Sequence, residues 1–260
     1  MINLTFVVDQ SDLRMTYLYD ELWAEGFNTK KYRRKEEYLG KVCYIFSPAK
    51  KFSREEVEDL KSNSILFCGN NPFGEILAVK HIEYHNLMKD EFYNYKNANL
   101  TAEAIIMLLI QNTVSSINSL NILLLGYGRV AGAAAKLFTK LNLNFSVATY
   151  DITERNRALL VTDKVYDLMP PLNLYDCIIN TVPAQIFTKE SLGEIKSSAL
   201  ILDVASDSVI SKSEQLGLKA TYMHQTGLPG KYTPKTAGTI LKNSILTTLT
   251  ENIKMKSEKL

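Results

Sequence analysis

One glycine-rich stretch constrains this 260-residue chain more than any other feature of its sequence. In NILLLGYGRVAGAAAKLF (residues 121–138), an apolar run leads through Gly126, Gly128 and Ala131 into a helical pattern. In such a GxGxx[G/A] sequence the first glycine permits a tight turn and the second lets a pyrophosphate approach the backbone, while the amides that start the helix favour an anion. The stretch predicts the first strand–turn–helix of a dinucleotide-binding sheet. The residues expected at the cofactor are Gly126, Gly128, Arg129 and Val130.

The end of the next strand, in SVATYDITER, should bind the adenosine ribose. Thr149 is neutral, Tyr150 could stack on the adenine, and Asp151 could either accept from the 2′-hydroxyl or cap the following helix. All three are predicted cofactor contacts. Two nearby arginines could meet a 2′-phosphate or be solvated, so NAD and NADP both stay open as the cofactor. These arginines are Arg155 and Arg157.

The rest of the chain alternates short apolar runs with helical patterns, which is typical of parallel sheets covered by helices. We therefore expect an α/β protein of two lobes, with a C-terminal Rossmann-type doubly wound parallel sheet and a smaller N-terminal α/β lobe. The expected parts are an N-terminal lobe over 1–99, a connecting helix over 100–117, a dinucleotide-binding domain over 118–238 and a C-terminal helix over 239–260.

Charge and cysteine usage narrow the class of protein. Thirty basic against 28 acidic residues give a net charge of +2, too balanced for a general nucleic-acid or polybasic membrane binder. The uncharged stretch over 104–128 is broken by Gln, Asn and Ser residues, so it does not resemble a membrane span. Cys43, Cys68 and Cys177 lie in apolar runs without paired spacing, as reduced buried thiols do. We expect a cytoplasmic protein without a signal peptide.

A second motif carries a family resemblance. The run GLPGKYTPKTAG (residues 227–238) resembles the GLPG…PKTAG signature of the family of dipicolinate synthase A subunits. Shorter matches are AEAIIMLLIQNT (102–113), LGYGR (125–129), INTVPAQIF (179–187) and LILDVAS (200–206). They occur in the family's order. The chain departs from the family in DVASDSVISKSE, where a glycine-rich segment is usual, and at Tyr150, where the family has a basic residue.

The resemblance implies an NAD(P)-dependent oxidoreductase of sporulation that makes pyridine-2,6-dicarboxylate from a hydroxylated tetrahydrodipicolinate. It also implies a partner, the flavoprotein-like B subunit of dipicolinate synthase, and a homo-oligomer is possible. Two other hypotheses stay open: another Rossmann oxidoreductase of a small carboxylic acid, and a non-catalytic nucleotide-binding subunit.

Oxidation of a dicarboxylate ring needs cations at defined positions, a hydride acceptor and a proton acceptor. Loops after the strands of an open α/β sheet line its ligand crevice, and the other lobe should face that crevice. For Lys235 the sequence leaves open a carboxylate or proton-transfer role and a solvated loop lysine. The expected catalytic residues are Lys235 and Glu103. The expected substrate contacts are Arg14, Asn180, Ser206, Lys231 and Thr236, and the further cofactor contacts are Thr181, Pro183 and Ala205.

Two other sequence patterns are not assigned to a ligand-binding site. His81, Glu83 and His85 spell HxExH, but this spacing lacks a third donor for zinc, so we expect a solvated surface cluster and no metal site. The run KKYRRKEEY (30–38) places acids directly after bases, which favours a solvated hairpin or strand edge.

Overall fold

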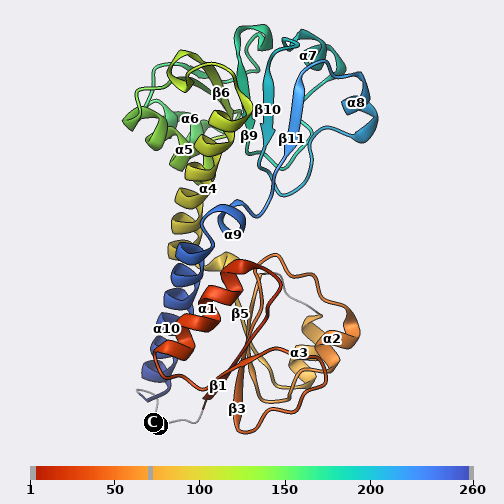
Figure 1. The fold of residues 1–260 in the computed structure, drawn as a ribbon, viewed down its shortest axis with the longest axis vertical. Helices are drawn as coiled ribbons and strands as arrows, with labels where there is room; N and C mark the ends of the chain where they lie inside the picture. The colour runs from red at the N-terminus through yellow and green to blue at the C-terminus, as the bar shows by residue number, and fades with distance from the viewer. Residues whose placement is uncertain (1–3, 70–72, 258–260) are drawn as a thin grey trace. The chain divides into compact units, whose positions relative to one another are not determined.

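A computed structural model describes residues 4–69 and 73–257, with side chains as far as Asn252. The chain forms two compact units (Figure 1). The first contains residues 1–97 together with 229–260, and the second contains 98–228. Each unit has a parallel sheet with helices between its strands, so the predicted α/β class is confirmed.

The first unit has a five-stranded parallel sheet in the order β2-β1-β3-β4-β5, a doubly wound arrangement that reverses between β1 and β3. Its strands are β1 (Leu4–Val8), β2 (Thr29–Lys31), β3 (Lys41–Ile45), β4 (Ile65–Cys68) and β5 (Glu83–Asn86). Strand β2 contains the start of the basic run and lies at the sheet edge, as one of the two interpretations of that run expected.

The second unit has a six-stranded parallel sheet in the order β11-β10-β9-β6-β7-β8. Its central strand β6 has β7 and β8 on one side and β9, β10 and β11 on the other, which is the doubly wound arrangement of dinucleotide-binding sheets. The strands are β6 (Asn121–Leu125), β7 (Asn144–Ala148), β8 (Val165–Tyr166), β9 (Cys177–Asn180), β10 (Leu200–Asp203) and β11 (Thr221–His224). The order reverses beside β6, which places the glycine-rich turn at the point where such sheets bind ligands.

Helices connect the strands in both units. In the first unit they are α1 (Leu13–Ala24), α2 (Arg54–Glu58), α3 (Gly74–Val79), the 3₁₀ turn η1 (Leu87–Lys89) and α10 (Pro234–Ser257). In the second they are α5 (Arg129–Lys140), α6 (Ile152–Ala158), α7 (Lys189–Glu194), α8 (Lys212–Gly217) and the 3₁₀ turns η2 (Ile117–Ser119) and η3 (Leu172–Leu174). Helices α4 (Glu91–Asn112) and α9 (Leu228–Tyr232) cross the unit boundaries.

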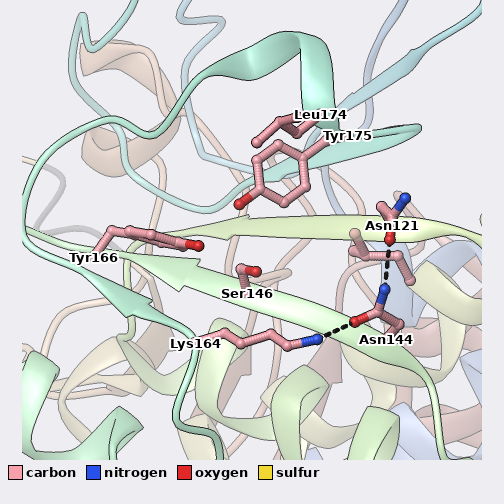
Figure 2. Close-up of a pocket in the computed structure, with 8 residues that line it drawn as sticks. Asn121, Asn144, Ser146, Lys164, Tyr166, Leu174 and Tyr175 are labelled. Atoms are coloured by element: carbon pink, nitrogen blue, oxygen red, sulfur yellow. Dashed lines mark hydrogen bonds between the residues drawn. The ribbon is translucent and has the colours of Figure 1, made fainter.

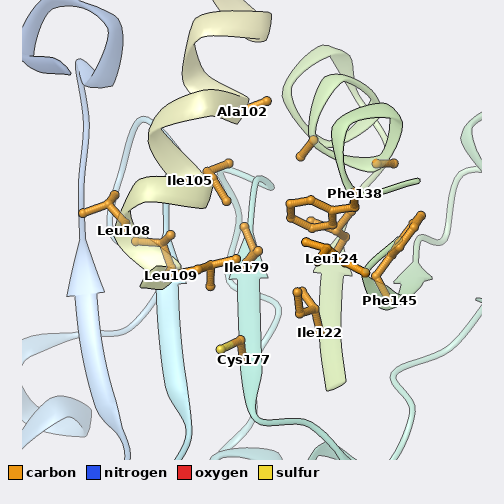
Figure 3. Close-up of a cluster of buried hydrophobic side chains, with 14 of the residues drawn as sticks. Ala102, Ile105, Leu108, Leu109, Ile122, Leu124, Phe138, Phe145, Cys177 and Ile179 are labelled. Atoms are coloured by element: carbon orange, nitrogen blue, oxygen red, sulfur yellow. The ribbon is translucent and has the colours of Figure 1, made fainter. Parts of the chain in front are cut away.

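Strand β6 shows how the second core is built. Ile122 and Leu124 belong to one buried cluster, and Leu123 and Leu125 belong to another. Successive side chains of a strand point to opposite faces, so both faces of this sheet are covered, as the apolar run predicts. In Figure 3 the side chains of α4 meet those of β6, β9 and α5 in the first of these clusters. Burial on this scale explains why α4 carries an unbroken apolar run.

The observed boundaries differ from the expected ones at both long helices. Helix α4 begins at Glu91 and ends at Asn112, where a helix over 100–117 was expected. The C-terminal helix begins at Pro234 and belongs to the first unit, because Leu241, Ile245 and Leu249 pack into the core that covers β1 and β3. The apolar residues that a helix packs against, more than its position in the sequence, therefore determine which unit it joins.

The three cysteines are buried and none forms a disulfide, as expected for reduced thiols. Burial raises the pKa of the Cys68 and Cys177 thiols to about 12 and raises the pKa of Cys43 further, so all three are protonated near neutrality. Among the described residues, no helix has the length and apolar character that a membrane crossing requires.

Candidate functional site

The glycine turn begins at Gly126, directly after β6. Its φ of +82° lies in the left-handed region, and its amide donates to the Ala148 carbonyl of β7 at 2.8 Å. A Cβ atom at this position would lie 2.7 Å from Val182 Cγ2 and 3.0 Å from Thr181 Oγ1. Both conformation and space therefore require glycine here. Thr181 is held in place in turn, since its hydroxyl donates to the Leu125 carbonyl at 2.8 Å.

Gly128, unlike Gly126, has open space over its backbone. It precedes α5 in an extended conformation, and no side chain caps the first turn of that helix. A Cβ atom here would meet only Glu154 Oε1, at 3.7 Å, so the space over the turn is open. An uncapped helix start with open space before it suits a pyrophosphate. A side chain at this position would fill that space. Of the neighbouring predicted contacts, Arg129 is exposed and Val130 half-buried.

One of the two roles considered for Asp151 is seen at the end of β7. Its carboxylate caps α6 by accepting from the Glu154 amide at 2.8 Å. Thr149 is buried, and its hydroxyl donates to Glu154 Oε2 at 2.8 Å. The Tyr127 amide donates to the same oxygen at 2.7 Å. Tyr150 is 65% exposed, which leaves its ring accessible. Glu154 therefore lies against the glycine turn.

Sequence reasoning missed Glu154. The signal for it was local, since an acid three residues after the cap Asp151 is the spacing of a capping box. In the structure, however, its carboxylate is bonded to Thr149 and Tyr127. Only the pairing of β6 with β7 brings those donors together.

A fully buried carboxylate ties the end of β9 and the loop after β10 to strand β11. Asp203 is 0% exposed, and its Oδ1 accepts from Asn180 Nδ2 at 2.8 Å and from the Ala205 amide at 3.2 Å. Its Oδ2 accepts from the Val209 amide at 3.0 Å and from the Tyr222 hydroxyl at 2.7 Å. Burial and the neighbouring Asp203 raise the pKa of Tyr222 to about 12, whereas its Ser208 bond acts in the opposite direction. The Tyr222 hydroxyl therefore stays protonated near neutrality and donates its hydrogen bond to Asp203.

The other predicted residues of these loops differ in their exposure to solvent. Asn180 is fully buried and donates also to the Val182 carbonyl at 3.0 Å, so its amide shapes the loop. Ala205 is buried, whereas Pro183 and Ser206 are exposed. At the end of β11, His224 Nε2 lies 3.0 Å from the Ala205 carbonyl. Sequence reasoning did not single out this histidine.

In the first unit, Arg14 is 6% exposed at the start of α1. Its Nη2 donates to Asp12 Oδ2 at 2.8 Å and to Ser47 Oγ at 3.1 Å, and its Nη1 donates to Tyr93 at 3.4 Å. Its Nε is buried and has no hydrogen-bond partner among the described residues. Burial raises the pKa of Asp12, but the Arg14 charge and hydrogen bonds outweigh it and the net pKa is lowered. The guanidinium thus keeps one buried donor that the described residues leave unused.

The segment with the GLPG…PKTAG resemblance lies in this same unit from Pro229 onward. A Cβ atom at Gly230 would lie 3.7 Å from Arg14 Cζ and from Asp12 Cγ, so α9 runs directly over the Arg14 guanidinium. Lys231, Lys235 and Thr236 are exposed along α9 and the start of α10. The fold thus brings Arg14 and this segment together. Glu103 is exposed on the part of α4 that belongs to the second unit.

A pocket of about 310 Å³ in the second unit lies away from the glycine turn. Its lining includes Asn121 and Asn144, the first residues of β6 and β7, whereas the turn follows the last residue of β6. The two ends of β6 are four residue steps apart, roughly 13 Å. Figure 2 shows Lys164, Asn144 and Asn121 hydrogen-bonded in series along its rim. These groups satisfy each other, and the pocket is not part of the site.

No group of three His, Cys, Asp or Glu side chains in the described part of the chain is arranged to hold a metal ion. Within the HxExH pattern, His85 Nε2 lies 3.1 Å from Glu83 Oε1, and Asn252 donates to the same oxygen at 3.1 Å.

No family model matches the chain. The A subunit of dipicolinate synthase from Bacillus subtilis (strain 168) is 31% identical over 219 residues, which are 77% of this chain and 72% of the relative. The chain belongs to the family of dipicolinate synthase A subunits.

Solved structures share the fold. The A chain of dipicolinate synthase from Bacillus subtilis has a TM-score of 0.80 at 20% identity, covering 97% of both chains. The NAD-dependent formate dehydrogenase from Staphylococcus aureus has a TM-score of 0.58 at 11% identity, covering 96% of this chain and 95% of that one. This member of the dipicolinate synthase family therefore has a dehydrogenase-like fold.

Proposed function

We propose that the chain is the dehydrogenase subunit that forms pyridine-2,6-dicarboxylate from a hydroxylated tetrahydrodipicolinate, with NAD or NADP as hydride acceptor. The observation that carries this proposal is the turn from Gly126 to Gly128, with its open space and the uncapped start of α5. Family membership supports the choice of substrate, since the 31% identical relative is the A subunit of dipicolinate synthase.

The reaction balances as two losses from the substrate ring. A hydroxylated tetrahydrodipicolinate that loses water becomes a dihydro ring, and loss of a hydride and a proton then gives the aromatic dicarboxylate. The bound nicotinamide supplies the site that accepts the hydride. The chain must therefore bind the dinucleotide, hold two carboxylates and accept a proton.

The second unit supplies the dinucleotide groups. The start of α5, with Arg129 and Val130, would hold the pyrophosphate, and the end of β7, with Thr149 and Tyr150, would bind the adenosine half. The loops after β9 and β10 would face the nicotinamide half, since they follow the strands on the other side of β6. Asn180 and Asp203 hold those loops from beneath. The loop residues assigned to the nicotinamide half are Thr181, Pro183 and Ala205.

The first unit supplies cations for the carboxylates. Lys231 and Lys235 can each form a charge-assisted hydrogen bond as a mobile point charge, and both side chains are exposed. The buried Arg14 guanidinium lies against α9 and would act on a carboxylate there through its charge, and Thr236 offers a hydroxyl. We assign proton transfer to Lys235 or to Glu103. A further carboxylate contact is assigned to Ser206.

The proposed setting of this reaction is the cytoplasm during sporulation. The chain acts there together with a second, flavoprotein-like subunit, as the family relation implies. Mixing the purified chain with that subunit should raise the rate of product formation, and a pull-down between the two should detect the complex.

The test is product formation. The purified chain is mixed with enzymatically generated hydroxytetrahydrodipicolinate and NAD or NADP, with and without the second subunit. Ultraviolet absorbance follows pyridine-2,6-dicarboxylate and the reduced nicotinamide. We expect equal amounts of the two products. A chain that binds neither dinucleotide in calorimetry and forms no product with either would contradict the proposal.

A further inference from the structure

We propose that Glu154 selects the dinucleotide, and that it selects NAD over NADP. The inference rests on the proposed function because it requires a dinucleotide at the glycine turn. It concerns the adenosine ribose, whose 2′ position carries a hydroxyl in NAD and a phosphate in NADP.

The position of the Glu154 carboxylate is fixed by two donors from different strand ends. The Tyr127 amide, in the turn after β6, donates to Oε2 at 2.7 Å, and the Thr149 hydroxyl, after β7, donates to it at 2.8 Å. The adenosine ribose of a dinucleotide lies between these two strand ends in sheets of this order. Glu154 therefore brings a negative charge to the ribose position from the first turn of α6.

The second oxygen of this carboxylate faces the turn. Oε1 lies 3.7 Å from where a Gly128 Cβ would be, whereas the Tyr127 and Thr149 donors both bond to Oε2. A carboxylate oxygen is an acceptor only, so Oε1 can receive the 2′-hydroxyl of NAD. A 2′-phosphate is largely deprotonated near neutrality and carries a charge of about −1.5 to −2, so the same oxygen repels it.

One of the two arginines of α6 is paired away from this charge, and the other lies at the glycine turn. Arg155 Nη1 is paired with Asp167 Oδ2 at 3.0 Å, on the side of β8. Arg157 Nη2 reaches the Tyr127 carbonyl at 3.5 Å, which places it at the turn backbone. Asp151 adds a second acid beside Glu154 at the helix start, and Tyr150 is neutral. The start of α6 thus presents two acids to the ribose position.

The experiment measures dissociation constants for NAD and NADP by calorimetry, for the full chain and for Glu154→Gln. Glutamine keeps the size of the side chain and an oxygen for the Tyr127 and Thr149 donors, but it presents an NH₂ donor where Oε1 stood. We expect the wild type to bind NAD at least about tenfold more tightly than NADP. Glu154→Gln should reduce that ratio by about tenfold or more, mainly through tighter NADP binding.

Glu194→Gln is the matched control, because Glu194 is an exposed glutamate on α7 of the same unit. Its ratio should equal that of the wild type. The fragments 5′-AMP and adenosine 2′,5′-bisphosphate, titrated against wild-type protein, give the same comparison without any variant.

Each outcome decides the inference. A wild type that prefers NADP, or a folded Glu154→Gln protein with an unchanged ratio, overturns the role of Glu154 and leaves the proposed oxidation standing. Binding of neither dinucleotide overturns the proposed function and this inference together.

Discussion

One buried side chain, Asp203, holds together the segments at the carboxyl ends of β9 and β10. Four donors from different segments converge on its carboxylate, which is itself fully buried. A buried donor that loses its acceptor costs roughly 1–3 kcal/mol. The loops proposed to face the nicotinamide thus depend on a residue that need not touch it.

Replacing this carboxylate tests the dependence. In Asp203→Asn the new amide nitrogen cannot accept from the Val209 amide or the Tyr222 hydroxyl. We expect the free energy of unfolding to fall by roughly 2–4 kcal/mol in urea titrations. Asp207→Asn, at an exposed site, should change it by less than about 0.5 kcal/mol. Equal stability of Asp203→Asn and wild type would show that the cluster is dispensable.

Gly128 allows the cofactor site to be tested without loss of the fold. Its φ of −69° suits any residue, and a Cβ atom meets only a side-chain oxygen. Gly128→Val should therefore keep its circular dichroism spectrum but lose binding of NAD and NADP by at least about a hundredfold, because the side chain fills the pyrophosphate position. Calorimetry measures the loss.

Gly132→Ala serves as the comparison in the same helix, since a Cβ atom there meets nothing within 4 Å. Its dinucleotide affinity should match that of the wild type. If Gly128→Val binds either dinucleotide normally, then the pyrophosphate does not lie at this turn.

Among the elements, α1 and α10 pack unusually closely. A Cβ atom at Gly238 would lie 2.7 Å from the Arg14 carbonyl oxygen and 3.0 Å from the Leu18 amide nitrogen. Both neighbours are backbone atoms of α1, so they cannot rotate away. This close approach gives a physical reason for the last glycine of the GLPG…PKTAG segment.

A methyl group at this contact should separate the two helices. We expect Gly238→Ala to lower the free energy of unfolding by roughly 1–3 kcal/mol, although alanine by itself favours a helix by about 1 kcal/mol. Gly193→Ala in α7, where a Cβ atom meets nothing within 4 Å, should leave stability unchanged or raise it slightly. Thermal unfolding of both variants measures the difference. A Gly238→Ala protein as stable as Gly193→Ala would mean that the contact yields easily.

At the scale of the whole molecule, the two units have distinct tasks in the proposed reaction. The residues proposed to bind the dinucleotide belong to residues 98–228, whereas Lys231 and Lys235 belong to the unit with Arg14. Affinity for the dinucleotide and turnover of the dicarboxylate should therefore respond to different substitutions.

Lys235→Ala tests this separation. Loss of one charge-assisted hydrogen bond to a carboxylate should lower kcat/KM for the dicarboxylate by about ten- to a hundredfold, equivalent to roughly 1.4–2.8 kcal/mol. The dissociation constant for the dinucleotide should stay unchanged. Steady-state kinetics and calorimetry measure the two quantities.

Lys30→Ala, in the edge strand β2, should alter neither quantity, because the side chain is exposed. Full turnover by Lys235→Ala would remove Lys235 from the carboxylate site, and loss of dinucleotide binding would assign it to the cofactor instead.

Local patterns were enough to predict the α/β class, the strand and turn of the glycine-rich stretch, and the buried thiols. The run NILLL and the glycines at 126 and 128 determine strand and turn through apolar character, left-handed conformation and close approach, which act over a few residues. The capping box of Ser53 and Glu56, whose spacing is a local sequence pattern, starts α2.

Tertiary structure alone decided the remaining features. Glu154 meets Tyr127, 27 residues earlier, because β6 pairs with β7; Asp203 meets Tyr222 because β10 pairs with β11. The C-terminal helix joins the first unit because its apolar residues find partners on α1 and β1. Such contacts depend on strand order and on which apolar surfaces remain to be buried. A sequence pattern reports the conformation of its own neighbourhood, but the fold chooses the distant partners.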